Sequence, residues 1–555
     1  MAAISSLDRF QAQSIWEMSV DIAKLLTMHH WLIRFASFAF TATILAAGAT
    51  AAQHPNILVI LADDLGYSDL GCYGSEIETP NLDGLAKGGL QFTQFYNTAR
   101  CWPTRGALLT GYYAQQIRRD IIPGDPEVKV GERPAWARLL PEMLKSAGYH
   151  SYHSGKWHID GKPVEGGFEH SYWVDDQDRH FSPQKHYNDD RALPSVKRDT
   201  GYYSTVAIAD HAIEQLKEHA SQHPKQPFFE YLAFTVPHFP IQALPEDIER
   251  YRARYKAGWE AVRDARWEKM QLLDVGADTL SAVEFNIGPR NDRTHALEKV
   301  GPGEINRPRP WDKLTAEQAD LQATKMAIHA AMVDRMDREI GRVLDQVRKM
   351  GAWDNTVIMF LSDNGASAET MVRGDDHDRS APLGSAGSFL CLGPGWSTVS
   401  NTPFRRHKTW VFEAGISTPL VVHWPKGIAA KGELRHNPGH VIDIVPTVLD
   451  LAGAERPSLP DAPTPPGKSI VPVFKHDDTV THDYLWWFHE GTRAIRVGEW
   501  KLVADKGGPW ELYDLSSDRA ESHDLSSSHA DKVANLAKQW QDHLEEFRTD
   551  ATKVK

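Results

Sequence analysis

NILVILADD, at residues 56–64, is an apolar run that ends in two carboxylates. Such a run is typical of a strand buried on both faces of a parallel sheet, and we predict a strand from Asn56 to Leu61. Four further runs of this kind are Tyr149–Ser154, Phe228–Phe234, Val357–Leu361 and Leu420–His423. Because helical patterns alternate with them, we predict an α/β fold: a doubly wound, largely parallel central sheet with helices on both faces.

Two helices are marked by end signals. The first is expected from Trp136 to Ser146, with Gly148 after its last turn. The second begins at Thr315 and Gln318, which have the spacing of a capping box, and its apolar positions continue to Gly351.

The C-terminal part has a different pattern. A proline-rich stretch, residues 457–466, precedes short strand-like runs at Ala494–Val497 and Trp500–Val503 and an amphipathic helix from Asp531 to Phe547. We therefore predict a main domain at residues 52–468 and a smaller C-terminal α+β domain at residues 469–555. Residues 250–311 are polar and weakly periodic, which fits either an insertion at the mouth of a site or a surface excursion.

The chain has 555 residues and a formal net charge of -13, which argues against a nucleic-acid binder. Residues 28–34 form a short basic start, residues 35–47 an apolar run, and Ala49-Thr50-Ala51 a small-residue cleavage site. We interpret residues 1–51 as an N-terminal extension with a signal peptide, and expect export to the periplasm or the medium. A membrane anchor is the alternative, although the run is shorter than the roughly 20 residues that span a bilayer.

Polar residues follow the predicted strands directly. They are Asp63-Asp64, Gly155-Lys156-Trp157-His158, Pro237-His238 and Asp363-Asn364-Gly365. Each alone has a structural reading as a turn or a helix cap. Since ligands of open α/β sheets bind beyond the carboxyl ends of the strands, their shared position predicts one site.

Four of these residues would present only oxygen atoms. They are Asp63, Asp64, Asp363 and Asn364. Such a set suits a hard cation, calcium or magnesium, and its flexibility favours calcium. Zinc is the alternative, with His158 and His238 as ligands.

Cys101 precedes Trp102-Pro103-Thr104-Arg105. Pro103 suits the first turn of a helix, which would place Cys101 at a helix N-terminus, where backbone N–H groups favour an anion. The alternative is a structural cysteine buried in the core. The chain has three cysteines, so at most Cys72 and Cys391 pair.

The motif C-x-P-x-R at residues 101–105, followed by Leu109-Thr110-Gly111, resembles the signature of type I sulfatases, members of the alkaline-phosphatase-like superfamily. The other motifs that match this family in order are Asn56 to Tyr67, Thr79 to Asp83, Gly155 to His158, Pro237-His238, Ser362 to Gly365, Pro403 to Gly415 and Trp510 to Leu515. The resemblance covers nearly all of the expected mature chain, and the ordered set is far more specific than any one motif.

The resemblance implies that Cys101 is oxidised to formylglycine by a formylglycine-generating or anaerobic sulfatase-maturating enzyme. One hydroxyl of the aldehyde hydrate then attacks sulfur, and the other expels sulfate. One calcium ion would be held by Asp63, Asp64, Asp363, Asn364 and the modified Cys101.

The resemblance also implies roles for the other residues. Asp363 would be the base that activates the attacking hydroxyl, Arg105 would hold that hydroxyl, and His158 would accept the proton that triggers sulfate release. Lys156, Lys408 and His238 would bind sulfate, and Lys408 or His238 would protonate the leaving alcohol. Trp102 and Thr104 depart from the small residue and the serine most common in the family.

These features predict a sulfatase with no membrane span in the mature chain, acting on an aryl sulfate or a sulfated carbohydrate. The segment Pro237 to Trp259 resembles bacterial arylsulfatases. One alternative is a phosphate or phosphonate monoester hydrolase on the same fold, and the other is a noncatalytic binder of sulfated glycans.

Overall fold

The computed structural model describes residues 54–123, 131–290, 294–372 and 377–553. The predicted signal peptide lies outside these residues. Residues 54–555 form one compact unit, so the predicted boundary at residue 468 stays a prediction. In the part of the chain that is described, no helix has both the length and the apolar character needed to cross a membrane.

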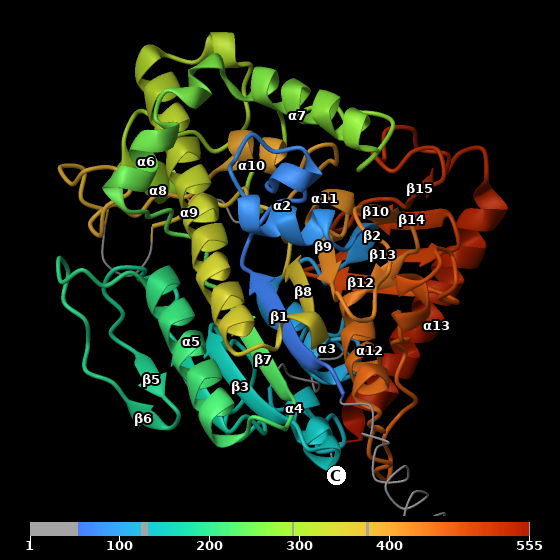
Figure 1. Ribbon diagram of the computed structural model, residues 1–555. Helices are drawn as coiled ribbons and strands as arrows, with labels where there is room; N and C mark the ends of the chain where they lie inside the picture. The colour runs from blue at the N-terminus through green and yellow to red at the C-terminus, as the bar shows by residue number, and fades with distance from the viewer. Residues whose placement is uncertain (1–53, 124–130, 291–293, 373–376, 554–555) are drawn as a thin grey trace, which may run out of the picture. The chain divides into compact units, whose positions relative to one another are not determined.

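A mixed, mostly parallel sheet forms the centre of the described chain (Figure 1). Its strand order is β10-β2-β9-β8-β1-β7-β3-β4-β5-β6, and β11 pairs with β2. The bounds are β1 (Asn56–Ala62), β2 (Leu90–Tyr96), β3 (His150–Gly155), β4 (His170–Val174), β5 (His186–Asn188), β6 (Arg191–Ala192), β7 (Phe228–Ala233), β8 (Thr356–Ser362), β9 (Ser417–His423), β10 (Glu433–Arg435) and β11 (Gly439–His440). The predicted α/β fold is confirmed.

Helices cover both faces of the sheet, and alternate side chains of β1 pack against each layer. Leu58 and Ile60 pack on the face that carries α2 (Pro80–Lys87), α5 (Ser204–Gln222) and α9 (Ala316–Lys349). Ile57 and Val59 pack on the opposite face, with α3 (Cys101–Thr110), α4 (Leu140–Leu144) and α12 (Ile444–Ala452). Apart from Asn56 at its start, β1 is fully buried on both faces.

Strand β9 departs from the prediction in length and direction. It begins at Ser417, three residues before the expected start, and runs antiparallel to both β8 and β2. The reason is that α11 (Glu413–Ile416) leads into β9 at the edge where β8 ends. There the backbone N–H of Gly365 donates to the carbonyl of Gly415, 3.1 Å away.

The helix predicted from Trp136 is wrong over its first four residues, because α4 begins only at Leu140. A helix starting at Trp136 would place Pro141 in its interior, where proline removes a hydrogen bond. The helix continues as a 3-10 turn and ends at Gly148, as expected. The capping box of Thr315 and Gln318 is confirmed at the start of α9.

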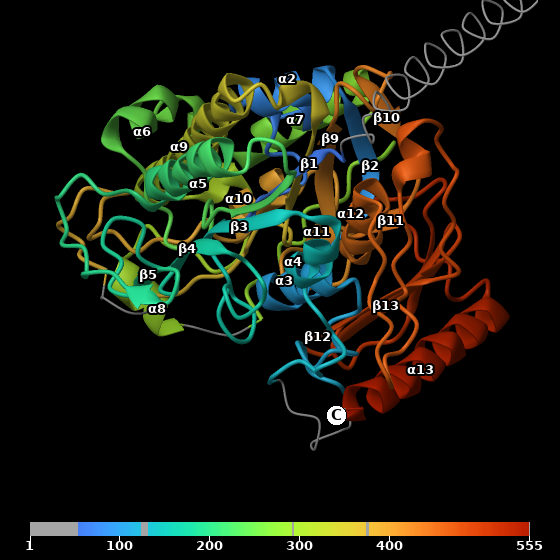
Figure 2. The same ribbon diagram turned by 60° about the horizontal axis from the view of Figure 1, so that its bottom comes forward.

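The C-terminal part contains a four-stranded antiparallel sheet with α13 (Ala530–Thr552) along it (Figure 2). Its strands are β12 (Leu485–His489), β13 (Thr492–Val497), β14 (Trp500–Ala504) and β15 (Glu511–Asp514). Trp540 of α13 stacks on Trp486 of β12 with ring centroids 5.4 Å apart. The predicted smaller α+β part is therefore confirmed, although α13 extends beyond Phe547 to Thr552.

Residues 250–311 contribute to the main core as well as to the surface. Helices α6 (Pro245–Tyr251), α7 (Trp259–Leu273) and α8 (Thr294–Val300) lie within or at the edge of this segment, and α10 (Pro394–Ser400) comes later in the chain. Trp259 is buried in the core, and Arg266 is buried in ion pairs with Asp69 and Glu76. Cys72 and Cys391 are free thiols, so the pairing left open above is not made.

Replacing Gly365 by alanine tests the close approach of β8 and β9. A Cβ at this position would lie 1.8 Å from the carbonyl oxygen of Ala414, so we expect Gly365→Ala to lower the free energy of unfolding by about 1–3 kcal/mol. Gly84, in the exposed part of α2, has no neighbouring atom within 4 Å of the place a Cβ would take, and Gly84→Ala is expected to raise stability by about 0.5–1 kcal/mol. Equal melting temperatures for the two variants would contradict this account of the strand end.

Candidate active site

Helix α3 begins at Cys101, which is buried at 2% exposure. Pro103 occupies its first turn, as predicted. The hydroxyl of Thr104 donates to the backbone carbonyl of Asp363 at 2.6 Å. Thr104 therefore retains a hydroxyl that ties the start of α3 to the end of β8.

Four oxygen-bearing side chains meet where β1 and β8 end. Asp63, Asp64, Asp363 and Asn364 are all buried, and β1 and β8 are neighbouring parallel strands. The amide nitrogen of Asn364 donates to Asp64 Oδ1 at 2.7 Å, and the backbone N–H of Asp64 donates to Asp363 Oδ1 at 3.3 Å. Asp64 has a positive φ of 67°, which places its backbone in the left-handed region.

Three buried cations face these carboxylates. Lys156 Nζ lies 2.6 Å from Asp63 Oδ2, and Lys408 Nζ lies 2.6 Å from Asp64 Oδ1. Arg105 donates two hydrogen bonds to Asp363 Oδ2, from Nε at 3.0 Å and from Nη2 at 2.7 Å. Every carboxylate in the cluster thus has a cationic partner.

Two oxygen atoms of the cluster are left over. Asp63 Oδ1 and Asn364 Oδ1 are buried and accept no hydrogen bond from any residue of the described ranges. A buried acceptor without a partner costs free energy, which binding a cation removes. The donor set is therefore suited to a hard divalent cation.

The pKa shifts of the carboxylates also favour a bound cation. Burial and the adjacent Asp63 carboxylate raise the pKa of Asp363 well above its ordinary value. Burial also opposes ionisation of Asp63, but Lys156, His238 and Arg105 overcome it and hold the pKa of Asp63 below its usual range. Two neighbouring carboxyl groups with opposed pKa shifts favour a bound cation, which would allow both to ionise.

The Cys101 thiol shares this environment. Burial would raise its pKa, but the ammonium groups of Lys156 and Lys408 outweigh burial and bring the pKa below its ordinary value. The position at the N-terminus of α3 acts in the same direction. Residue 101 therefore lies where the protein stabilises negative charge.

The two histidines predicted for the site, His238 and His158, have different surroundings. His238 Nε2 lies 3.9 Å from Asp64 Oδ2, and its Nδ1 donates to the carbonyl of Phe239 at 2.7 Å. His238 has a ligand atom within 4.8 Å of those of Asp63 and Asp64. His158, in contrast, has a buried Nδ1 with no partner among the described residues, and its ring meets Trp102 edge-on with centroids 5.8 Å apart. Burial, together with Lys156, lowers the pKa of His158 well below its ordinary value.

Sequence reasoning missed Glu369. Its carboxylate lies 3.2 Å from Arg100 and 3.8 Å from Lys408. Pro289 and Arg290, from the polar segment before α8, line a hollow beside Lys408 together with Glu369. Glu369 lies in an irregular loop, where nothing in the sequence distinguishes it from a solvent-exposed carboxylate.

Removing Arg105 should destabilise the fold strongly, because it leaves Asp363 without its buried partner. We expect Arg105→Ala to lose about 3–5 kcal/mol of unfolding free energy. The matched control is Arg252→Ala, which breaks an exposed pair with Glu249 and should cost less than about 1 kcal/mol. Chemical denaturation measures both, and similar losses in the two variants would show that the buried pair contributes little.

Comparisons with known proteins agree with this geometry. Residues 55–454 match the sulfatase family, and residues 405–550 match the C-terminal part of N-sulphoglucosamine sulphohydrolase. An uncharacterized sulfatase of Schizosaccharomyces pombe is 33% identical over 88% of this chain and 93% of its own length. The arylsulfatase of Klebsiella aerogenes is 32% identical over 77% of this chain and 94% of its own length.

Solved structures share the fold. A protein in complex with its substrate, D-glucosamine-2-N,6-O-disulfate, has a TM-score of 0.61 at 20% identity and covers 91% of this chain and 100% of its own. A protein in complex with a neocarrahexaose has a TM-score of 0.62 at 23% identity, over 90% of this chain and 94% of its own. With the family match over residues 55–454, these findings establish that the chain belongs to the sulfatase family, the enzymes that hydrolyse sulfate esters.

Proposed function

We propose that the protein hydrolyses sulfate esters with Cys101 oxidised to formylglycine and with one bound calcium ion. The observation that carries the proposal is the burial of residue 101 at a helix N-terminus within a cluster of three carboxylates and three cations. A formylglycine-generating or anaerobic sulfatase-maturating enzyme would recognise the segment Cys101 to Arg105. Pro103 and Arg105, the residues of the motif that the family shares, are present.

Asp63, Asp64, Asp363, Asn364 and the modified residue 101 would hold the calcium ion. The fit rests on the unpartnered Asp63 Oδ1 and Asn364 Oδ1, which no described residue contacts by a hydrogen bond, and on the all-oxygen character of the four side chains. When bound, the ion would polarise a sulfate oxygen and increase the acidity of the attacking hydroxyl.

The remaining side chains would orient the sulfate and move protons. Lys156, Lys408 and His238 would hold the sulfate oxygens, because their charged or polar atoms meet at the carboxylate cluster. Asp363 would accept the proton of the attacking hydroxyl, and Arg105 would hold the formylglycine hydroxyl.

Two proton transfers complete the proposed reaction. Lys408 or His238 would donate a proton to the leaving alcohol. His158, whose Nδ1 has no partner among the described residues, would accept the proton whose removal releases sulfate.

The substrate class is an aryl sulfate or a sulfated carbohydrate. The arylsulfatase of Klebsiella aerogenes supports the first. The solved fold relatives, whose structures contain a glucosamine disulfate and a neocarrahexaose, support the second. We further propose that the protein is exported, on the strength of the N-terminal sequence pattern.

A phosphate or phosphonate monoester hydrolase is the second candidate, since the same cluster could bind phosphate. Among the described residues, the carboxylate cluster has His238 within ligand distance but not the histidine-rich group that a two-zinc phosphatase needs. The ratio of turnover on aryl sulfate and aryl phosphate tests this choice, and we expect sulfate to be preferred. A preference for phosphate would overturn it.

Replacing the proposed nucleophile should abolish activity without unfolding the protein. We expect Cys101→Ala to show no sulfate release, with a melting temperature close to that of the wild type. Cys72→Ser, at a half-buried thiol outside the site, is the control and should retain turnover. Substantial activity in Cys101→Ala would exclude residue 101 as the nucleophile.

The modification itself is measurable by mass. In protein from its native host, the peptide that contains residue 101 should have the mass of formylglycine. An unmodified thiol there, with binding of sulfated glycans but no turnover, would favour the noncatalytic binder instead.

Removing the cation should also abolish sulfate release. We expect a calcium chelator to reduce sulfate release to background and added calcium to restore it, because the carboxylates then lose the charge that allows them all to ionise. Full activity in excess chelator would contradict the oxygen-ligand site.

A further inference from the structure

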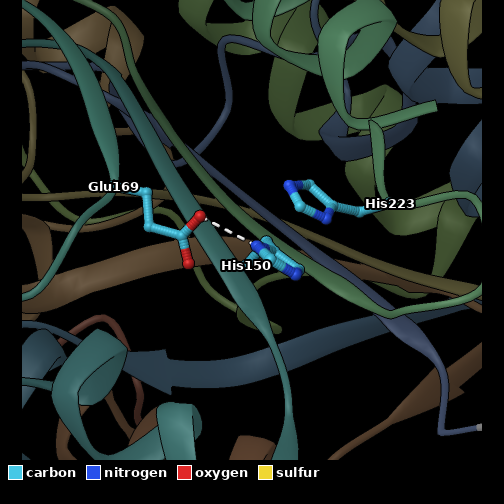
Figure 3. A group of neighbouring side chains, drawn as sticks. All are labelled: His150, Glu169 and His223. Atoms are coloured by element: carbon cyan, nitrogen blue, oxygen red, sulfur yellow. Dashed lines mark hydrogen bonds and ion pairs between the residues drawn. The ribbon is translucent and has the colours of Figure 1, made fainter. Parts of the chain in front are cut away.

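A second group of metal-ligating side chains lies at the opposite end of β3 from the active site. It consists of His150, Glu169 and His223 (Figure 3). His150 begins β3, whereas Lys156 follows its carboxyl end. The extended strand between them separates the two by roughly 20 Å. This group, here called the His-Glu-His cluster, is therefore distinct from the carboxylate cluster.

The ligand atoms of the cluster are close together. One atom from each of the three side chains lies within 4.8 Å of the other two. His150 Nδ1 lies 2.8 Å from Glu169 Oε2, and the imidazole rings of His150 and His223 stack with centroids 3.6 Å apart.

Most ring nitrogens of His150 and His223 make no hydrogen bond within the described ranges. Within the described ranges, the His223 ring makes no side-chain hydrogen bond, and the His150 ring makes one, to Glu169. The neighbouring His219 does not compete for a ligand, because its Nδ1 contacts the Tyr152 hydroxyl at 3.1 Å and its Nε2 contacts the Gln226 carbonyl at 3.0 Å.

The backbone fixes all three positions. The N–H of His150 donates to Pro227, the N–H of Glu169 donates to Ser151, and the N–H of His223 donates to His219 at the end of α5. The first two bonds, 3.1 and 2.8 Å long, join neighbouring segments at the sheet, and the third, 2.8 Å long, closes the last turn of α5. His150 and His223 are half-buried and Glu169 is exposed, so an ion could enter from solvent.

We propose that the His-Glu-His cluster binds a divalent transition metal ion of the zinc class. Two imidazoles and one carboxylate are ligands that zinc takes readily, with water in the fourth position. Rotation of the two histidine side chains would turn one nitrogen of each toward the ion. The nitrogen ligands separate this site from the all-oxygen cluster, which favours calcium. A bound ion would link β3, the segment before β4 and the end of α5.

The test is a zinc titration of the full-length protein kept saturated with calcium, so that the carboxylate cluster is filled. Isothermal titration calorimetry should detect one zinc equivalent, and zinc should raise the melting temperature. We expect His223→Gln and Glu169→Gln each to weaken this binding at least tenfold and to remove the thermal shift. His523→Gln, at an exposed histidine beside Asp518, is the control and should bind zinc as the wild type does.

A spectroscopic measurement identifies the ligands. With one equivalent of Cu2+, electron paramagnetic resonance should show coupling to two imidazole nitrogens, and His223→Gln should lose one of them. Melting temperatures measured without metal establish that the variants fold. Zinc binding that is absent in the wild type, or equally tight in the wild type, His223→Gln and Glu169→Gln, would overturn the proposal.

Discussion

The candidate active site depends on the pairing of buried charges at the carboxyl ends of β1 and β8. Asp63, Asp64 and Asp363 are fully or almost fully buried, where an unpaired carboxylate costs several kcal/mol. Lys156, Lys408 and Arg105 stabilise them from three separate segments of the chain. Two of these cations, Lys156 and Lys408, also act on residue 101, so the groups that stabilise the buried carboxylates favour negative charge there as well.

Close packing of the backbone holds this arrangement in place. Gly155 precedes Lys156, and a Cβ there would lie 1.8 Å from the carbonyl oxygen of Ala233. At Gly415, just before β9, a Cβ would lie equally close to the carbonyl oxygen of Trp410. Strand ends that approach so closely leave little freedom to the charged side chains that follow them. These contacts restrict the backbone directly before Lys156 and directly before β9.

The sequence predicts the buried strands and the residues after them well, because a parallel strand buried on both faces is a continuous apolar run and its polar end stands out. Other features depend on contacts between distant segments. The direction of β9 follows from the path of the chain through α11, and the role of Glu369 follows from its approach to Arg100 and Lys408. The His-Glu-His cluster was also missed, since His150, Glu169 and His223 come from three separate segments and match none of the motifs found in the sequence.

The central claim is that these oxygen atoms gather around one cation opposite residue 101. A crystal structure of the modified protein grown with calcium tests it most directly. The account predicts a single ion bound by oxygen atoms of Asp63, Asp64, Asp363 and Asn364 and in contact with residue 101. An ion bound elsewhere at saturating calcium, with the four side chains still paired only to protein groups, would contradict it.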